Sequence, residues 1–379
     1  MLDRIVWQTA TASPLRIAGE DPLSFCGEPD GALARVAARL ASRQARGLPM
    51  PDALELAFYL RAEGEPHVWP HAWTLSGEAL DPSDEAARLR RFLGSLSTDG
   101  VRRCGVARAK VGKEEAIAAV IVGAFADLAP LPTAAYAGEW LRFDARMLVP
   151  TSAAKLVVLG PSGLPRTVPT TLHDDHVEAS FAVERPGPFT VQLLANVERG
   201  PRPVLEADVF AGVEAPAEWV ALPAPGEDAA RGLSDDRAAL RAMLDAARSS
   251  EGLTALGRDP GLDRAAQEHA EAMRASHLLA HDAGDGGPLE RLRRNGLAAA
   301  IAGENVAHES SVVRAHRALW ASPSHRGNLL DTRFASLGVG VAPDHDGAVW
   351  VCEIFVDFAE AGNLAVPADD SKFQGAPAQ

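Results

Sequence analysis

The sequence predicts an α+β protein built from three folded modules. The chain has 379 residues, which is more than a single hydrophobic core usually organises. In its middle part, short segments appear in which every second residue is apolar. The regions on either side of that part share an ordered set of residues at a nearly constant separation. These observations predict two helix-and-sheet modules with an all-β module between them.

An internal repeat links the N-terminal and C-terminal modules. Five residues recur 229 residues later in the same order: Asp30, Leu33, Arg35, Ala37 and Ala41 match Asp259, Leu262, Arg264, Ala266 and Ala270. Gly105-Val106 and Gly338-Val339 continue the series at an offset of 233. Chance alignment of alanine-rich helices is the alternative explanation. The preserved order favours residues 1–135 as a diverged copy of the C-terminal module.

Residues 136–213 have the pattern of a β-sandwich. Apolar and polar residues alternate along Leu141–Met147, Val177–Val183 and Phe189–Leu193, which is the period of strands that bury one face. Turn formers such as Gly160-Pro161-Ser162-Gly163 separate these segments. Short strands at regular intervals favour an immunoglobulin-like sandwich.

The remaining boundaries follow from composition and capping signals. Residues 214–234 are rich in Ala, Pro and Glu without sustained periodicity, which predicts a linker. Asp235-Asp236 then precedes apolar residues at helical spacing, which indicates the capped first helix of a module over 235–362. We expect residues 363–379 to form a flexible tail.

Charge and hydropathy restrict the classes of partner. The chain has 37 basic and 51 acidic residues and a net charge of −14, which would repel nucleic acid and anionic lipid headgroups. No apolar run approaches the roughly 20 residues that a membrane-spanning helix needs. We therefore expect no nucleic-acid partner and no transmembrane span.

The C-terminal module contains a series of motifs that together point to a family. They are the helical segment Gly261–Met273, Ala280-His281, Gly303-Glu304-Asn305, the run Ser322–Asn328, the glycine-rich segment Gly338–Gly340 and the strand Val349–Phe355. In order, spacing and residue type, the series resembles the CAP superfamily of cysteine-rich secretory proteins, antigen 5 and pathogenesis-related proteins, specifically its bacterial branch. The resemblance covers roughly residues 235–360. It implies an α-β-α sandwich there and a degenerate CAP-like sandwich in the N-terminal copy.

In that family, two histidines and two acidic residues converge in one cleft. By motif, His281 matches the first histidine, Glu304 the acid of the Gly-Glu-Asn element and His325 the second histidine. The second acid of the family falls near Ser322, so this set of four is incomplete. Glu353 on the closing strand is a secondary candidate for the cleft, because its side chain lies there only if it faces inward.

Asn305 is a further secondary candidate for the same cleft. Two neutral imidazoles and a carboxylate suit a borderline divalent cation. We expect His281 and His325 to bind such a cation, with zinc as the best match, and Glu304 to orient an imidazole or complete the shell. Affinity should then fall below about pH 6.5, the unperturbed histidine value. The alternative is that these groups only hydrogen-bond one another and hold the loops on the sheet.

The resemblance implies non-catalytic binding of an envelope or extracellular ligand, such as a lipid, a sterol-like molecule or a glycan. A metal-dependent hydrolase or peptidase is the alternative, and the sequence assigns no catalytic residue. A structural adhesion or scaffold protein is a second alternative, with protein partners at the sandwich or the degenerate module. We expect an extracellular, periplasmic or outer-envelope location, with any signal peptide absent from this chain. A cytoplasmic location is the other possibility.

The three cysteines have no metal-ligand spacing. Cys26 and Cys104 flank the first helix and the Gly-Val strand of the N-terminal copy, which would be adjacent if the copy folds like its counterpart. They are predicted to form a disulfide, and Cys352 to be a buried thiol on a strand. The repeat offset places Ala72 at the position of Glu304, so we expect no second site in the copy.

Overall fold

The computed structural model describes residues 6–7, 26–96, 100–198, 200–345, 347–358 and 377–378. Its helices and strands confirm the predicted α+β class. The chain divides into two compact units. The first holds the N-terminal module and most of the β-sandwich, and the second holds the C-terminal module. Within the described ranges, no helix combines the length and apolar character that crossing a membrane would require.

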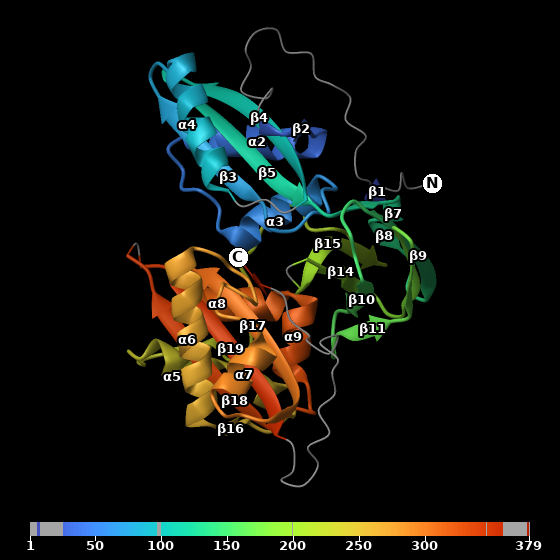
Figure 1. Ribbon diagram of the computed structural model, residues 1–379. Coiled ribbons are helices and arrows are strands. Elements are labelled where there is room, and N and C mark those ends of the chain that lie inside the picture. Colours follow the sequence, from blue (N-terminus) through green and yellow to red (C-terminus); the bar gives the residue numbers. More distant parts are fainter. Residues whose placement is uncertain are drawn as a thin grey trace. The chain divides into compact units, whose positions relative to one another are not determined.

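A five-stranded sheet forms the middle layer of the C-terminal module. Its strands, in spatial order, are β16 (Gly257–Arg258), β18 (Ser336–Pro343), β19 (Val349–Phe358), β17 (Ala299–Glu309) and β20 (Pro377–Ala378). The helices are α5 (Asp236–Ser250), α6 (Pro260–Ser276), α7 (Pro288–Arg294), α8 (Val312–Ala321) and α9 (Pro323–Leu330). Helices cover both faces of the sheet (Figure 1), which makes the α-β-α sandwich expected from the motifs.

Strand alternation decides which side chains meet which helices. Apolar residues of α6 and α7 form one core cluster with Ala302 and Val306 of β17 and with Cys352 and Ile354 of β19. Because alternate strand residues face opposite ways, Glu304 lies on this α6 face. Neighbouring residues of the same strands, including Glu353, lie on the opposite face.

A four-stranded sheet forms the middle of the N-terminal module. Its order is β2 (Glu28–Pro29), β4 (Val101–Val111), β5 (Glu114–Ala124) and β3 (His71–Gly77). The helices are α2 (Gly31–Ala45), α3 (Ala53–Ala62) and α4 (Pro82–Ser95). Helices α2 and α3 pack on one face through Ala118 and Val120. Helix α4 packs on the other face through Ala119 and Ile121.

The two helix-and-sheet modules share a strand order and a helix start. In each, a two-residue strand runs parallel to the next strand of the sheet, as β2 does beside β4 and β16 beside β18. An aspartate then caps the following helix: Asp30 accepts two backbone N–H groups of α2, and Asp259 accepts two of α6. Such caps satisfy orphan donors of the first turn. The repeated residues therefore serve the same structural purpose in both modules.

Two sheets form the central β-sandwich. One has the order β11 (Arg166–Val168), β10 (Ala153–Leu159), β14 (Gly187–Val197), β15 (Gly200–Ala211) and β8 (Ala134–Ala135). The other has the order β12 (Thr170–His173), β13 (His176–Val183), β9 (Glu139–Met147) and β6 (Ala126–Leu128). A two-residue pair, β1 (Val6–Trp7) with β7 (Leu131–Pro132), forms a separate two-stranded sheet. Buried and exposed residues alternate along β9 and β13, as the sequence period requires.

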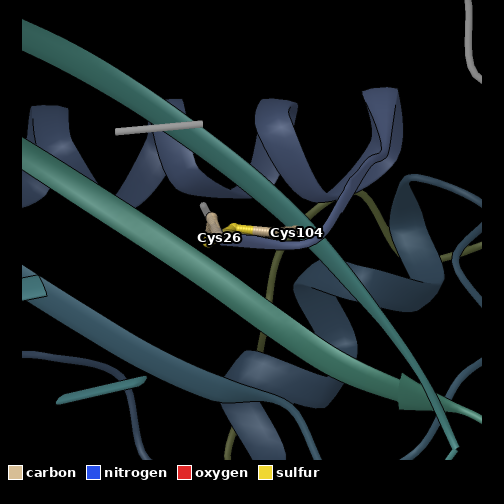
Figure 2. Close-up of a disulfide and its surroundings, with 2 residues drawn as sticks. All are labelled: Cys26 and Cys104. Atoms are coloured by element: carbon tan, nitrogen blue, oxygen red, sulfur yellow. A yellow bond between two sulfur atoms is a disulfide. The ribbon is translucent and has the colours of Figure 1, made fainter. Parts of the chain in front are cut away.

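The cysteines behave as the repeat predicted. Cys26 and Cys104 form a disulfide, with their Cα atoms 5.9 Å apart. The bond joins the start of the module to β4 (Figure 2). Cys352 is a free, buried thiol on β19. Both parts of the cysteine prediction are therefore confirmed.

The structure divides the predicted linker 214–234 into two parts. Its first part is exposed, but Ala224 is buried, and the 3-10 helix η1 (Glu227–Ala230) packs against α5. Pro225 accepts a hydrogen bond from Nε2 of His316 at 2.8 Å. The second part of this stretch is thus docked on the C-terminal module. In the predicted tail 363–379, Pro377 and Ala378 form β20 beside β17, and the tail's other residues lie outside the described ranges.

The glycine of the repeated Gly-Val pair is needed where helix and sheet touch. A Cβ on Gly338 would lie 2.3 Å from the carbonyl carbon of Leu262 in α6, and one on Gly105 would lie 2.0 Å from the backbone nitrogen of Ala34 in α2. Neither helix backbone can move away without separating the layers. Only glycine lets the two elements approach this closely.

We predict that Gly338→Ala destabilises the C-terminal module by roughly 3 kcal/mol, because the added methyl overpacks a backbone contact. Gly327→Ala is the matched control, since that helical glycine has no atom within 4 Å of the added Cβ, and alanine should stabilise α9 by up to about 1 kcal/mol. Hydrogen exchange of the β18 amides measures both effects. Equal protection in the two variants would contradict the close-packing argument.

A buried carboxylate and two histidines in the C-terminal module

Glu304 of β17 lies at the centre of a fully buried polar cluster. One carboxylate oxygen, Oε1, is 2.8 Å from Nδ1 of His281 and 3.8 Å from Nε2 of His269. The other oxygen, Oε2, accepts from the Arg291 guanidinium and from the Cys352 thiol, whose sulfur is 3.6 Å away. Both oxygens of Glu304 are therefore engaged by protein donors.

These neighbours keep Glu304 ionised. Burial alone raises the pKa of a carboxyl group, but the opposing effects of Arg291, His269 and His281 are larger together and hold the pKa of Glu304 well below its usual range. A carboxylate can only accept, so Nδ1 of His281 must carry a proton. When the ring is neutral, its lone pair is consequently on Nε2.

Sequence reasoning missed Arg291, His269 and Asp285. Arg291 of α7 is fully buried and donates to the carbonyl oxygen of His281 at 2.7 Å. His269 of α6 places Nδ1 2.9 Å from Oδ2 of Asp285 and Nε2 3.0 Å from the carbonyl oxygen of Ala280. A weak signal existed, because Arg291 follows the buried Pro288 by three residues and so shares its face of α7.

A second polar group lies on the opposite face of the sheet. Nδ2 of Asn305 donates to Oε2 of Glu353 at 3.0 Å and to the carbonyl oxygen of His325 at 3.3 Å. Oδ1 of Asn305 accepts from Asn328 of α9 at 2.9 Å. Glu353 is fully buried, and this burial raises its pKa to about 7 against the opposing hydrogen bond from Asn305. Glu353 is therefore a buried second carboxyl group, on the face of the sheet opposite to Glu304.

His325 of α9 is almost completely buried. Burial, followed by the charge of nearby His281, lowers its pKa to about 3. The ring is therefore neutral at physiological pH.

Five buried polar atoms of these residues have no hydrogen-bond partner in the structure: Nε2 of His281, Nδ1 and Nε2 of His325, Oε1 of Glu353 and Nε of Arg291. Throughout the described ranges, no set of three or more His, Cys, Asp or Glu side chains is arranged to hold a metal ion. A cation held by the two histidines would therefore have two protein ligands. Glu304 fits the orienting role that the sequence left open, because both its oxygens are already used.

The comparison with family models gives one match to the chain. Residues 241–354 match the model described as the cysteine-rich secretory protein family, CAP. This part of the chain is a CAP domain. The comparison with curated proteins gives no match.

Three solved structures are similar to parts of this protein. An outer surface protein from Borrelia burgdorferi has 21% identity, with 33% of this chain and 95% of that chain covered and a TM-score of 0.32. An extracellular protein with an SCP domain from Bacillus anthracis has 18% identity, coverage of 60% and 87%, and a TM-score of 0.31. A cysteine-rich secretory protein from Staphylococcus aureus has 11% identity, coverage of 61% and 83%, and a TM-score of 0.28.

The N-terminal module replaces the polar residues of the CAP domain with apolar ones. Gly338 pairs with Ile354 in the CAP domain sheet, and Gly105 pairs with Val120 in the N-terminal sheet. These equivalent pairs define a residue-by-residue alignment of the two sheets. Across β17 and β19, this alignment places Ala72, Trp73 and Ala119 at the positions of Glu304, Asn305 and Glu353. Ala119 and Trp73 belong to a hydrophobic cluster with α4. The copy keeps the sheet but has none of these three polar groups.

We predict that Arg291→Met destabilises the CAP domain by roughly 3–5 kcal/mol, because it leaves the ionised Glu304 buried without its main countercharge. Arg293→Met is the matched control on the same helix, since Arg293 is exposed and its replacement should change stability by less than about 0.5 kcal/mol. Urea unfolding measures both. Equal losses in the two variants would show that Arg291 is not the countercharge on which Glu304 depends.

Glu353→Gln should change the pH dependence of stability. The unfolded carboxyl loses its proton near its ordinary pKa of 4.5, whereas the folded one keeps it up to about 7. The Glu353 contribution therefore destabilises the wild type progressively from pH 4.5 to 7, by about 3 kcal/mol in total. Urea unfolding in EDTA should show Glu353→Gln gaining stability over the wild type across this window. Glu304→Gln should instead lose stability relative to the wild type at neutral pH. A stability difference between Glu353→Gln and the wild type that does not change with pH would refute the raised pKa of Glu353.

Proposed function

We propose that this is an exported binding protein whose CAP domain holds a small polar ligand between His281, His325 and Glu353. The unpartnered buried atoms of these three side chains support the proposal most directly. A buried polar group without a partner costs roughly 1–3 kcal/mol, and such groups in a folded protein call for a bound molecule or a functional role. A purely structural cluster would be expected to satisfy its own hydrogen bonds.

A divalent cation, best zinc, is the ligand that we propose first. Imidazole nitrogen and carboxylate oxygen are ligands that zinc accepts. Glu304 would act behind His281 by fixing the proton on Nδ1 and leaving Nε2 for the ligand. With two imidazole ligands, the remaining positions would be open to water or to a bound molecule. A hydroxyl or headgroup of a lipid, sterol-like molecule or glycan is the kind of group that such a site could accept.

The disulfide supports an extracytoplasmic location. The disulfide between Cys26 and Cys104 requires an oxidising environment to form and persist. It lies in the module that has lost the polar site, where it adds a covalent link between the start of the module and its sheet. A periplasmic, outer-envelope or extracellular protein has such an environment.

Metal-dependent hydrolysis is the second candidate, and Glu353 favours it. A carboxyl group with a pKa of about 7 can exchange a proton at neutral pH. A neutral imidazole, His325, belongs to the same site. On this hypothesis, zinc-loaded protein would cleave a fluorogenic casein substrate and Glu353→Gln would abolish cleavage. Absence of zinc-dependent turnover in the wild type would leave the binding function as proposed.

We predict that zinc titration of the metal-free protein, without a histidine tag and at pH 7.5, shows one saturable site. His281→Ala and His325→Ala should each weaken binding by about tenfold or more, because each removes one of two imidazole ligands. His308→Ala is the control, because His308 stacks on Trp350 with ring centroids 4.0 Å apart and is not assigned to the site. Two calorimetric results would contradict this prediction: no saturable site, or a site whose affinity neither substitution changes. Either result would leave only the structural interpretation of these histidines.

A further inference from the structure

The outer face of the sheet β12-β13-β9-β6 carries an exposed tryptophan. Trp140 of β9 is 71% exposed, and Tyr136 in the turn just before this strand is 69% exposed. Between residues 26 and 358 of the described ranges, no other Phe, Tyr or Trp side chain is as exposed as these two. A tryptophan buries a large apolar area when it binds a partner. The solvent exposure of Trp140 therefore needs an explanation.

The strand register leaves the indole ring of Trp140 uncovered. Trp140 lies directly opposite Ala182 of β13, and the next outward pair along the two strands is Arg142 with Ser180. Both partners on β13 have small side chains. Because outward residues alternate along a strand, these small residues border the ring on the same face. Trp140 is therefore a flat apolar platform at one end of the sheet surface.

Polar groups continue this surface beyond the ring. Nη2 of Arg142 is 2.7 Å from Oε1 of Glu178 and 3.3 Å from Oδ2 of Asp144. The side chains of Arg142 and Glu178 are 64% and 55% exposed. Exposed ion pairs of this kind contribute little to stability. They do offer donors and acceptors side by side, which suits hydroxyl groups because a hydroxyl both donates and accepts.

We propose that this face of the sandwich binds a glycan. A pyranose ring is apolar on its C–H faces and polar around its rim, so one sugar can stack on Trp140 while its hydroxyls or those of the next sugar hydrogen-bond to Arg142, Glu178 and Ser180. The surface suits a protein partner less well, because protein interfaces are apolar and depleted of charge at their centres. It suits an anionic membrane less well, because Asp144 and Glu178, which pair with each other across β9 and β13, add negative charge to the same face. This binding is independent of the CAP domain site.

The test uses the full chain and three insoluble probes: peptidoglycan sacculi, chitin and cellulose. Co-sedimentation should show saturable binding to at least one of them, and Trp140→Ala should weaken it about tenfold or more, as loss of a central aromatic contact does. Trp140→Phe should retain part of the affinity, and Arg142→Met should reduce it. Leu222→Ala is the matched control, because Leu222 is 70% exposed but lies outside the sandwich.

A second control separates this inference from the proposed function. His281→Ala should bind the glycan as the wild type does, whatever its effect on zinc. Undiminished binding by Trp140→Ala overturns the proposal, and so does failure of the wild type to bind all three polysaccharides. If Trp140→Ala keeps glycan binding but loses self-association, this face would be assigned to a protein partner. If it keeps glycan binding but loses binding to anionic lipid vesicles, this face would be assigned to a membrane.

Discussion

The buried ion pair between Glu304 and Arg291 organises the CAP domain. Placing a carboxylate inside the protein is costly, and Arg291 offsets that cost from α7. The same guanidinium group donates to the carbonyl oxygen of His281, so the pair fixes β17, α7 and the segment between α6 and α7 together. The orientation of the His281 ring follows from this arrangement, because the carboxylate determines which nitrogen carries the proton.

The polar groups of the CAP domain lie on both faces of one sheet. Glu304 belongs to the α6 face, while Asn305 and Glu353 belong to the face covered by α9. In the first group, both oxygens of Glu304 are engaged by protein donors, whereas in the second group the carboxyl of Glu353 keeps an unpartnered oxygen and has a raised pKa. Such a division is typical of functional sites, in which a rigid support carries groups that are costly for stability.

The N-terminal module has a strand order like that of the CAP domain but lacks its buried polar residues. Ala72, Trp73 and Ala119 occupy the positions of Glu304, Asn305 and Glu353, and the helix on that face packs on an apolar surface. A disulfide joins the start of the module to its sheet. The module is thus held by packing and covalent closure, with no buried carboxylate of its own at these positions. Its similarity to the CAP domain lies in the strand order, the aspartate-capped helix and the close-packed glycine.

The α+β class, the repeat and the cysteine pairing could be predicted from periodicity, from the order of residues along the chain and from residue types. His281, Glu304 and His325 were found through the resemblance to the CAP superfamily. The burial of Glu353 and the role of Arg291 as countercharge became visible only in the folded chain. A strand residue can face either way, and an arginine in a charged helix resembles its exposed neighbours. The pKa of His325 and the docking of η1 also depend on burial, which is set by distant segments.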